Sequence, residues 1–422
     1  MNRAVAWSAI EAAAGGALSL LSAVLIARLI GPEELGLAAA AIAGHVVLWV
    51  GVNGLFADAL VQRAECGDDV ASAALWAGGA AGVLAALAQG GIGWLLAWQL
   101  GDPRQLAMGL GLAATLPVVG MAGIAQGLLT RRGAYRALAA RTVLGQGMGV
   151  AIGVGLALRG AGAWAMVAQQ VTTTGIGALT LLVLARWRPS LVCRWTDLRD
   201  LLRVGLPLTG STLTQIARYR VFAVLVGACA GPAELGQTHM AFRLVDTVRD
   251  LAFTALWRLL LPDLSRLQHD RAAMLARVDR LLVGCVAAIL PLSLLLAIVI
   301  PPATRLLLGP AWAAAGMAAL PLTGLMAVMA VTMPSGVALV ALGQVRLTLY
   351  ENLAALALCM IGTWALRPGS AWDAVLLWCA AQALVVPYAL RANAAALGVG
   401  VARLLSPRHG LGPWRARNAT GT

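Results

Sequence analysis

The hexamer Gly31-Pro32-Glu33-Glu34-Leu35-Gly36 returns 200 residues later as Gly231-Pro232-Ala233-Glu234-Leu235-Gly236. Each copy separates two long apolar stretches, and Gly-Pro is a strong turn signal. The offset is about half of the 422-residue chain, with six apolar stretches between equivalent positions. Because six is even, the repeat predicts two parallel six-helix halves related by an axis along the membrane normal, as in one class of transporters. A chance recurrence of a turn-forming string is the alternative.

The composition around these hexamers is that of a membrane protein. Hydrophobic residues make up 60% of the chain and charged residues 12%, whereas soluble domains have about 25% charged residues. These values exclude a soluble globular protein and a disordered chain. The formal net charge is +13, and every basic residue among the 31 is arginine.

Apolar stretches long enough to span a bilayer recur along the whole chain. We expect the first 30 residues to form a permanent helix, because they carry only Arg3 before an apolar part that contains Glu11. The all-α prediction is about 12 transmembrane helices near residues 7–30, 36–61, 71–98, 105–129, 137–158, 161–185, 204–229, 236–261, 281–300, 312–342, 347–366 and 372–397.

Arginine counting predicts the orientation. With both termini in the cytoplasm, 21 arginines fall in cytoplasmic segments and five outside, as the positive-inside rule requires. The predicted organisation is an N-terminal six-helix bundle at 1–186, a cytoplasmic linker at 187–203, a C-terminal six-helix bundle at 204–398 and a basic cytoplasmic tail at 399–422. We expect a multi-pass protein of the bacterial cytoplasmic (inner) membrane.

Ionisable groups within the spans are costly and usually functional. They gather in the repeat-related helices, and the eighth span holds the densest group. His239, Arg243, Asp246 and Asp250 step by four, three and four residues, so they share one helix face, and Arg249 lies about a quarter turn away. These groups predict a cationic, water-filled cavity near the membrane midplane. Alternatively, Arg243 with Asp246 and Arg249 with Asp250 form structural ion pairs.

The seventh span carries a similar stripe of Ser211, Thr214, Gln215 and Arg218. Arg220 lies about 200° from Arg218 and cannot share that face of a regular helix. Arginine binds phosphate through paired, charge-assisted hydrogen bonds. The stripe therefore favours an anionic substrate.

The first two spans contribute Glu11, His45, Asn53 and Asp58. His45 and His239 are candidates for proton coupling, since histidine titrates near neutral pH, or they are structural histidines with satisfied hydrogen bonds. Glu11 and Asp58 are candidates for binding a coupling cation, or they simply reach water at a span end. The run Thr172-Thr173-Thr174 is expected to bond its own helix carbonyls, with substrate contact as the alternative.

Sequence motifs for catalysis are absent. There is no P-loop, no HExxH and no nucleophile elbow, and the predicted external loops are too short for a catalytic domain. The six cysteines have no metal-site spacing and are read as apolar fillers. We therefore expect no enzyme activity, cofactor or metal. The basic loops suit acidic membrane lipids rather than nucleic acid.

Several segments together carry a family resemblance. Residues 27–36 with the following Ala59-Leu60-Val61-Gln62-Arg63 resemble the opening of bacterial polysaccharide-biosynthesis flippases. Val204-Gly205-Leu206-Pro207-Leu208 and the second hexamer resemble the start of their second half, and Leu308-Gly309-Pro310-Ala311-Trp312 also fits. These are the Wzx-type oligosaccharide flippases of the MOP superfamily, which includes MATE multidrug exporters and lipid II flippases. The resemblance covers about residues 5–400.

This resemblance implies movement of undecaprenyl-diphosphate-linked oligosaccharide to the outer leaflet by alternating access through a cationic central cavity. It implies a lipid-linked oligosaccharide and membrane lipids as partners, together with polysaccharide polymerase and glycosyltransferases. Arg28, Arg218 and Arg243 are the first positions to test. One departure is that the family's Asp-Arg pair and following Arg are replaced by Phe222, Ala223 and Ala228.

Two other functions remain open from the sequence. One is a MATE-like multidrug exporter on the same fold, to which the acidic residues Glu11, Asp58, Asp246 and Asp250 could contribute a local negative charge. The other is a non-transporting membrane scaffold of a polysaccharide synthesis complex, which would tolerate the loss of the intramembrane charges.

Overall fold

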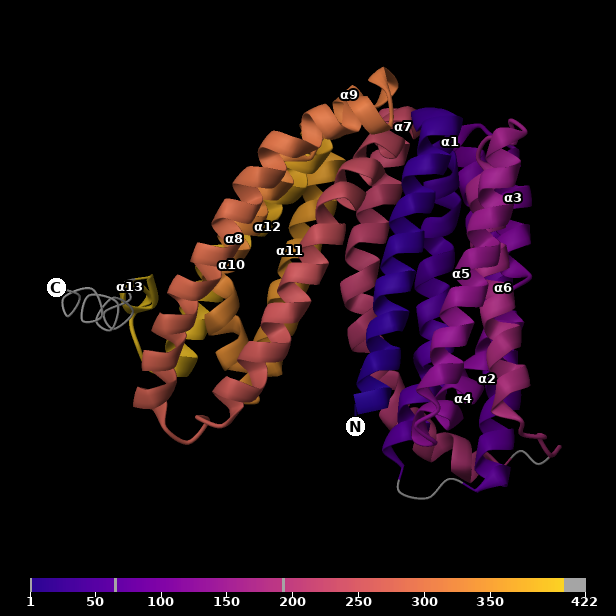
Figure 1. The fold of residues 1–422 in the computed structure, drawn as a ribbon, viewed down its shortest axis with the longest axis horizontal. Helices are drawn as coiled ribbons and strands as arrows, with labels where there is room; N and C mark the ends of the chain where they lie inside the picture. The colour runs from indigo at the N-terminus through magenta and orange to yellow at the C-terminus, as the bar shows by residue number, and fades with distance from the viewer. Residues whose placement is uncertain (1, 64–66, 192–193, 406–422) are drawn as a thin grey trace. The chain divides into compact units, whose positions relative to one another are not determined.

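The computed structural model describes residues 2–63, 67–191 and 194–405, and these residues form helices and no strand (Figure 1). They pack into two compact units, Met1–His239 and Met240–Thr422. The helices of the first unit are α1 (Asn2–Gln62), α2 (Asp68–Leu100), α3 (Arg104–Ala113), α4 (Leu116–Arg131), α5 (Tyr135–Leu158) and α6 (Trp164–Ala185), followed by α7 (Trp195–Ser265), which continues into the second unit. The second unit continues with α8 (Arg271–Leu307), η1 (Pro310–Trp312), α9 (Ala313–Ala318), α10 (Leu320–Ala341), α11 (Val345–Leu366), α12 (Ala371–Leu397) and α13 (Val401–Leu405).

The described helices account for the expected number of spans. Nine are long and apolar enough to cross a membrane. Two of these, Leu18–Gln62 and Ile216–Ser265, contain 45 and 50 residues, and about 20 residues suffice for one crossing, so each contains two spans. The shorter apolar helix Tyr350–Leu366 adds one more. The prediction of about twelve spans is confirmed for the described part of the chain.

The two hexamers break their helices in the same way. Gly31 has φ 80° and ψ 173°, and Gly231 has φ 86° and ψ 172°. This backbone region is accessible in practice only to glycine. The following Pro32 and Pro232 suit a helix start, because that position needs no N–H donor and proline fixes a helical φ. The sequence repeat is therefore also a structural repeat.

The hexamers also pack against each other within the first unit. A Cβ atom on Gly36 would lie 1.8 Å from the carbonyl oxygen of Pro232, and a Cβ atom on Gly236 would lie 1.9 Å from that of Pro32. The contact is thus reciprocal, as in an interface between two copies of one element. It explains why both hexamers end in glycine.

A second internal repeat appears in the fourth helix of each half, where the sequence predicted uninterrupted spans. A break separates α3 from α4 just before Leu116-Pro117, and another separates α9 from α10 just before Leu320-Pro321. Proline lacks an N–H group and its ring clashes with the carbonyl four residues earlier, which ends the preceding helix. The spans predicted at 105–129 and 312–342 therefore each contain an interruption of the helical hydrogen bonding, although the linking residues Ala114, Thr115 and Ala319 keep right-handed helical backbone angles.

The turns after these helices match as well. Gly133 and Gly343 have φ 65° and 77°, and each is a glycine that follows a helix end. Ala134 N–H donates to the Leu129 carbonyl (2.9 Å), and Gln344 N–H donates to the Leu339 carbonyl (3.1 Å). Equivalent features thus recur in order along both halves. The unit boundary between His239 and Met240 falls within α7, and the predicted domain limits at 186, 204 and 398 remain predictions.

Glu34 of the first hexamer holds three segments of the first unit together. Its carboxylate accepts a hydrogen bond from the Ala163 N–H (2.7 Å) before α6 and pairs with Arg104 (3.0 Å) at the start of α3. Arg104 also pairs with Asp102 (2.8 Å). Burial raises the pKa of Asp102, but the hydrogen bonds and charge of Arg104 outweigh it and hold this pKa below its usual value. We call Glu34, Asp102 and Arg104 the charge clasp.

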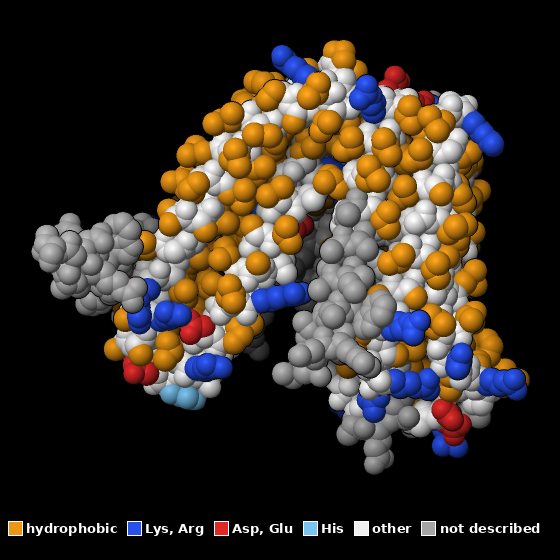
Figure 2. Space-filling view, viewed as in Figure 1, with side chains coloured by type: hydrophobic (Ala, Val, Ile, Leu, Met, Phe, Trp, Pro, Cys, Tyr) orange, Lys and Arg blue, Asp and Glu red, His pale blue; other side chains and the backbone are white. Residues whose placement is uncertain are grey.

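Arginines also complete helix ends. Arg131 donates to the carbonyls of Leu60 (2.8 Å) and Arg63 at the end of α1, and Arg132 donates to the Ala185 carbonyl (2.7 Å) at the end of α6. Cationic side chains stabilise helix C-termini because they satisfy free carbonyls and oppose the helix dipole. In the space-filling view, hydrophobic side chains cover the helix faces of both units, and charged side chains gather near the helix ends (Figure 2).

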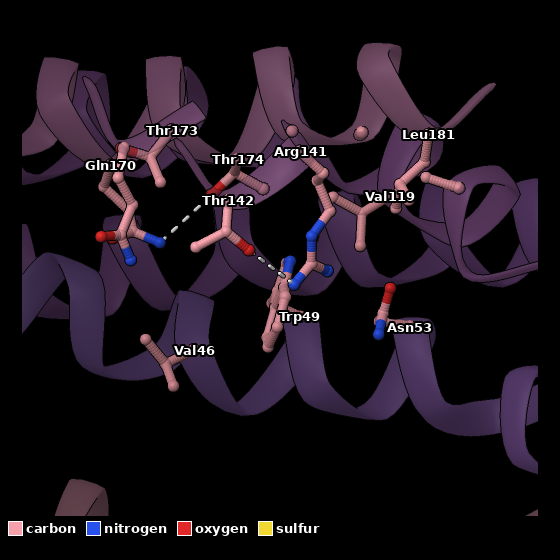
Figure 3. Close-up of a pocket in the computed structure, with 14 residues that line it drawn as sticks. Val46, Trp49, Asn53, Val119, Arg141, Thr142, Gln170, Thr173, Thr174 and Leu181 are labelled. Atoms are coloured by element: carbon pink, nitrogen blue, oxygen red, sulfur yellow. Dashed lines mark hydrogen bonds between the residues drawn. The ribbon is translucent and has the colours of Figure 1, made fainter. Parts of the chain in front are cut away.

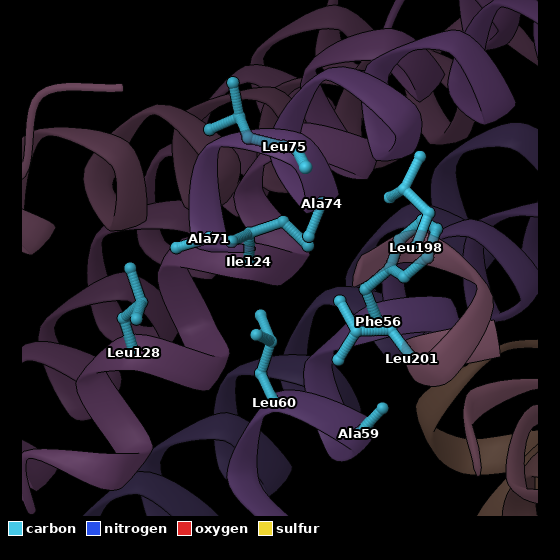
Figure 4. Close-up of a cluster of buried hydrophobic side chains, with 11 residues drawn as sticks. Phe56, Ala59, Leu60, Ala71, Ala74, Leu75, Ile124, Leu128, Leu198 and Leu201 are labelled. Atoms are coloured by element: carbon cyan, nitrogen blue, oxygen red, sulfur yellow. The ribbon is translucent and has the colours of Figure 1, made fainter. Parts of the chain in front are cut away.

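The buried side chains form local clusters between helices. One joins Phe56 and Leu60 of α1 to Leu75 of α2, Ile124 of α4 and Leu201 of α7 (Figure 4). In the second unit, Leu264 of α7 packs in one cluster with Met274 of α8 and Val337 of α10. These clusters fix the helices that carry the polar groups described next.

Candidate functional site

A polar cavity of about 310 Å³ lies inside the first unit, among α1, α4, α5 and α6 (Figure 3). Its polar wall consists of Asn53, Arg141, Thr142, Gln146, Gln170, Thr173 and Thr174. Trp49 supplies an aromatic ring, and Val46, Val119 and Leu181 are among its apolar residues. All these residues belong to candidate membrane spans, where polar groups favour a functional role.

Arg141 of α5 is the charged residue of this wall. One guanidinium nitrogen donates to Gln126 Oε1 (3.0 Å) and the other terminal nitrogen to Thr142 Oγ1 (3.3 Å). In the close-up, the guanidinium lies between the α5 backbone and the side chains of Trp49 and Asn53 (Figure 3). Two neutral acceptors therefore orient a cation at the cavity.

Close packing of α5 on α6 positions the hydroxyl groups. A Cβ atom on Gly145 would lie 2.8 Å from the Thr173 carbonyl, and one on Gly149 would lie 2.9 Å from the Gln169 carbonyl. Glycines at these positions allow two membrane helices to approach closely. Thr173 and Thr174 are consequently held beside Thr142 and Arg141 on the facing helix.

The amide groups give the cavity both donors and acceptors. Gln170 Nε2 donates to Thr174 Oγ1 (3.2 Å). The Oε1 atom of Gln146 is buried and has no hydrogen-bond partner in the described part of the chain. A buried acceptor without a partner carries a desolvation cost that a ligand hydroxyl can relieve. The wall is therefore suited to a ligand rich in hydroxyl groups.

The second unit contains a different cavity of about 440 Å³. Its lining includes the carboxylates of Asp250 and Glu351, the amide of Asn393 and the hydroxyl of Thr332. Asn393 donates to Ser335 Oγ (3.0 Å), whereas its Oδ1 atom and Glu351 Oε1 are buried without a hydrogen-bond partner among the described residues. This lining therefore combines mostly apolar side chains with a few carboxylate and amide oxygens.

The predicted residues separate into several environments. Asn53 lines the first cavity and Asp250 the second, whereas Arg28, Arg218 and Arg243 belong to neither lining. Arg249 reaches Asp246 (2.7 Å) and Asp250 (2.9 Å), although the helical wheel placed it off their face. The long arginine side chain spans that quarter turn. Arg249 thus forms an ion pair with each acid in this structure, and the predicted substrate role of Arg249 remains a prediction.

The remaining candidates differ in their surroundings. His239 lies 3.1 Å from the Tyr219 hydroxyl, which satisfies one ring nitrogen. His45 is fully buried, and neither ring nitrogen has a hydrogen-bond partner in the described chain. Asp58 is exposed. The side chains of Glu11 and Gln215 lie outside the described residues.

The sequence reasoning did not assign Arg141, Trp49, Gln146 or Gln170 to a site. A usable signal was present in α6, where 170, 173, 174, 177, 178 and 181 recur at helical spacing and all line the cavity. This face of α6 carries mostly uncharged residues, so a search for charged groups within the spans does not find it.

A bundle of apolar helices that encloses polar cavities within its spans defines a multi-pass membrane protein with candidate binding sites inside its spans. The chain belongs to the polysaccharide biosynthesis protein family, whose model matches residues 25–316. This membership confirms the resemblance carried by the two hexamers.

One curated relative is the succinoglycan biosynthesis transport protein ExoT of Rhizobium meliloti (strain 1021). It is 25% identical over 272 residues, which cover 64% of this chain. The chain spans about half the length of that relative, since the match covers 55% of it.

Solved structures show the same fold. The lipid II flippase MurJ in an inward closed conformation matches with a TM-score of 0.70 and 12% identity, over 99% of this chain and 93% of MurJ. An inward-facing multidrug resistance MATE family transporter of the MOP superfamily matches with a TM-score of 0.68 and 14% identity, over 92% and 98% of the two chains. The all-α, MOP-type fold prediction is confirmed.

Proposed function

We propose that this protein is a flippase, and not an enzyme, that moves an undecaprenyl-diphosphate-linked oligosaccharide across the cytoplasmic membrane by alternating access. The observation that carries the proposal is the hydroxyl- and amide-rich cavity with Arg141 inside the spans of a polysaccharide biosynthesis family member. A glycan must leave water to cross a bilayer, and such a wall replaces its lost hydrogen bonds. The relative ExoT is named a succinoglycan biosynthesis transport protein, which also supports a transport function.

The cationic groups of the repeat-related helices would receive the diphosphate. In low dielectric, an arginine attracts an anion far more strongly than in water. The proposed substrate contacts are Arg28, Asn53, Gln215, Arg218, Arg243 and Arg249. The proposed coupling and cavity groups are Glu11, His45, Asp58, His239, Asp246 and Asp250.

A deletion strain tests the function directly. We expect loss of surface polysaccharide and accumulation of its lipid-linked repeat unit facing the cytoplasm. Arg218→Ala and Arg243→Ala should fail to restore surface polysaccharide while inserting normally, and the exposed Arg136→Ala should restore it. Normal surface polysaccharide in both arginine variants would contradict a substrate-binding role for Arg218 and Arg243. It would favour the scaffold alternative.

Orientation and partners follow from the proposal. We infer that the protein lies in the bacterial inner membrane with both termini in the cytoplasm, close to glycosyltransferases and a polymerase that make and consume its substrate. Single cysteines at positions 188 and 199 should resist a membrane-impermeant thiol reagent in intact cells and react after permeabilisation. Labelling in intact cells would contradict the proposed orientation.

A multidrug exporter is the second candidate, because the second-unit cavity combines a largely apolar lining with the Glu351 carboxylate and would suit an amphipathic cation. It predicts that deletion raises susceptibility to cationic drugs and leaves polysaccharide unchanged. The flippase predicts the opposite pair of results.

A further inference from the structure

We propose that the cavity of the first unit is a subsite for one sugar ring bearing a single carboxylate, and not for the diphosphate. This assignment rests on the proposed function and specifies which part of the substrate this cavity takes. It makes Arg141 and Trp49 specificity-determining residues for the transported glycan.

The single positive charge of the cavity wall favours a ligand group with a single negative charge. Arg141 contributes one positive charge, and the lining includes no acidic side chain in the part of the chain that the structure describes. A diphosphate brings at least two negative charges into a low-dielectric region, and one guanidinium would leave part of that charge uncompensated. One carboxylate matches one guanidinium and can bind it through two parallel hydrogen bonds.

The guanidinium is also held in position before a ligand arrives. Gln126 and Thr142 each accept a hydrogen bond from a different terminal nitrogen of Arg141. These contacts reduce the freedom of the side chain, so less entropy is lost on binding. Lysine carries the same charge but lacks the planar fork that these two acceptors orient.

The remainder of the wall matches a pyranose ring. Trp49 offers an indole, which combines a large apolar face with a polar N–H, opposite the hydroxyl groups of α6 (Figure 3). A sugar ring likewise has apolar C–H faces and hydroxyl edges. Gln146 Oε1, buried without a partner among the described residues, is available to accept from one such hydroxyl. Gln170 and Thr173 supply further hydroxyl and amide groups.

The cavity has room for a sugar ring. Its volume of about 310 Å³ lies at the lower end of the roughly 300–1,000 Å³ range of small-molecule sites. The rest of an oligosaccharide would lie outside this cavity. The proposed subsite therefore binds one sugar residue of the repeat unit.

Ligand-observed saturation-transfer NMR on the full chain in lipid nanodiscs tests the assignment, because it detects weak binding. The probes are methyl glucuronide, methyl glucoside and inorganic diphosphate. We expect saturation transfer to the glucuronide, with about tenfold weaker binding of the uncharged glucoside, since the glucoside lacks the charge-assisted hydrogen bonds to Arg141. Diphosphate should not displace the glucuronide.

Variants connect the signal to the cavity. Arg141→Gln should weaken glucuronide binding about tenfold and leave glucoside binding unchanged. Arg141→Lys should recover part of the loss, and Trp49→Leu should weaken both sugars. Arg136→Gln, an exposed arginine on the same helix, is the matched control and should bind as the wild type does. Thermal midpoints of all variants report whether each remains folded.

The outcomes separate this subsite from the proposed function. Absence of glucuronide binding to the wild type, equal binding by Arg141→Gln, or displacement by diphosphate overturns the subsite. If the deletion strain loses surface polysaccharide but the glucuronide does not bind, the flippase stands and the subsite fails. If the glucuronide binds through Arg141 but deletion leaves polysaccharide unchanged, the subsite stands and the proposed function fails.

Discussion

Replacing Gly36 by alanine tests the reciprocal contact between the two hexamers. The added Cβ atom would lie 1.8 Å from the Pro232 carbonyl oxygen. Carbon–oxygen approaches in proteins lie at about 3.3–3.6 Å, so the two segments would have to separate by about 1.5 Å. The obstructing atom is backbone, and no rotamer change can relieve the clash.

The expected cost follows from two opposing effects. Overpacking of this kind destabilises by about 1–3 kcal/mol, and glycine-to-alanine replacement inside a helix returns up to about 1 kcal/mol. We therefore expect Gly36→Ala to lower stability by about 1–2 kcal/mol. Gly236→Ala should behave in the same way, because its Cβ would lie 1.9 Å from the Pro32 carbonyl oxygen.

The assay is the temperature at which the purified protein loses its monodisperse size-exclusion peak, compared at one heating rate because unfolding of such proteins is usually irreversible. Gly175→Ala is the matched control, since no atom lies within 4 Å of its added Cβ. The double variant should lose less than the sum of the single losses, because both substitutions separate the same two segments. Equal midpoints for Gly36→Ala and Gly175→Ala would refute the contact.

Three further outcomes are expected from features outside the cavities. Gly231→Ala should destabilise by about 1–3 kcal/mol through backbone strain alone, since open space surrounds its Cβ position; an unchanged thermal midpoint would contradict the helix break. Arg403→Gln should destabilise by about 3–5 kcal/mol because it leaves the buried Asp279, its partner at 2.7 Å, unpaired, and Asp279→Asn in the same chain should recover part of the loss. Because the pKa of Asp102 is lower in the folded protein than in the unfolded chain, the ionised carboxylate stabilises the fold at pH values above its unfolded-state pKa of about 3.9. This stability is lost as the pH falls through the folded-state pKa. Midpoints measured between about pH 6 and pH 3 should therefore converge for wild type and Arg104→Gln at the acidic end, and parallel curves would exclude the charge clasp.

The fold was largely predictable because its determinants are local. Twenty-residue apolar stretches must form helices in a bilayer, and the Gly-Pro hexamers mark where the chain turns. The interruptions before Leu116-Pro117 and Leu320-Pro321 were missed, although proline inside an apolar run is itself a signal. Hydropathy alone does not distinguish a regular span from one whose hydrogen bonding is interrupted at a proline.

The candidate site was less predictable. Charge density in the seventh and eighth spans drew attention to Arg243 and Asp246, and the roles of those residues remain predictions. The first-unit cavity instead combines one arginine with uncharged groups, and its walls come from four helices separated by more than a hundred residues. No single segment carries that combination.

The sequence by itself determined the membrane class, the number of spans and the internal repeat, because each depends on residues close together in the chain. The tertiary structure decided that Gly36 meets Pro232, that Arg249 serves both Asp246 and Asp250, and that Arg141 lies at a cavity with Trp49. The first and third join positions far apart in the chain, and the second depends on how far one arginine side chain reaches within α7. Helix packing brings the distant positions together, because Gly36 and Gly236 allow the two hexamers to approach and the glycines of α5 allow it to pack closely on α6.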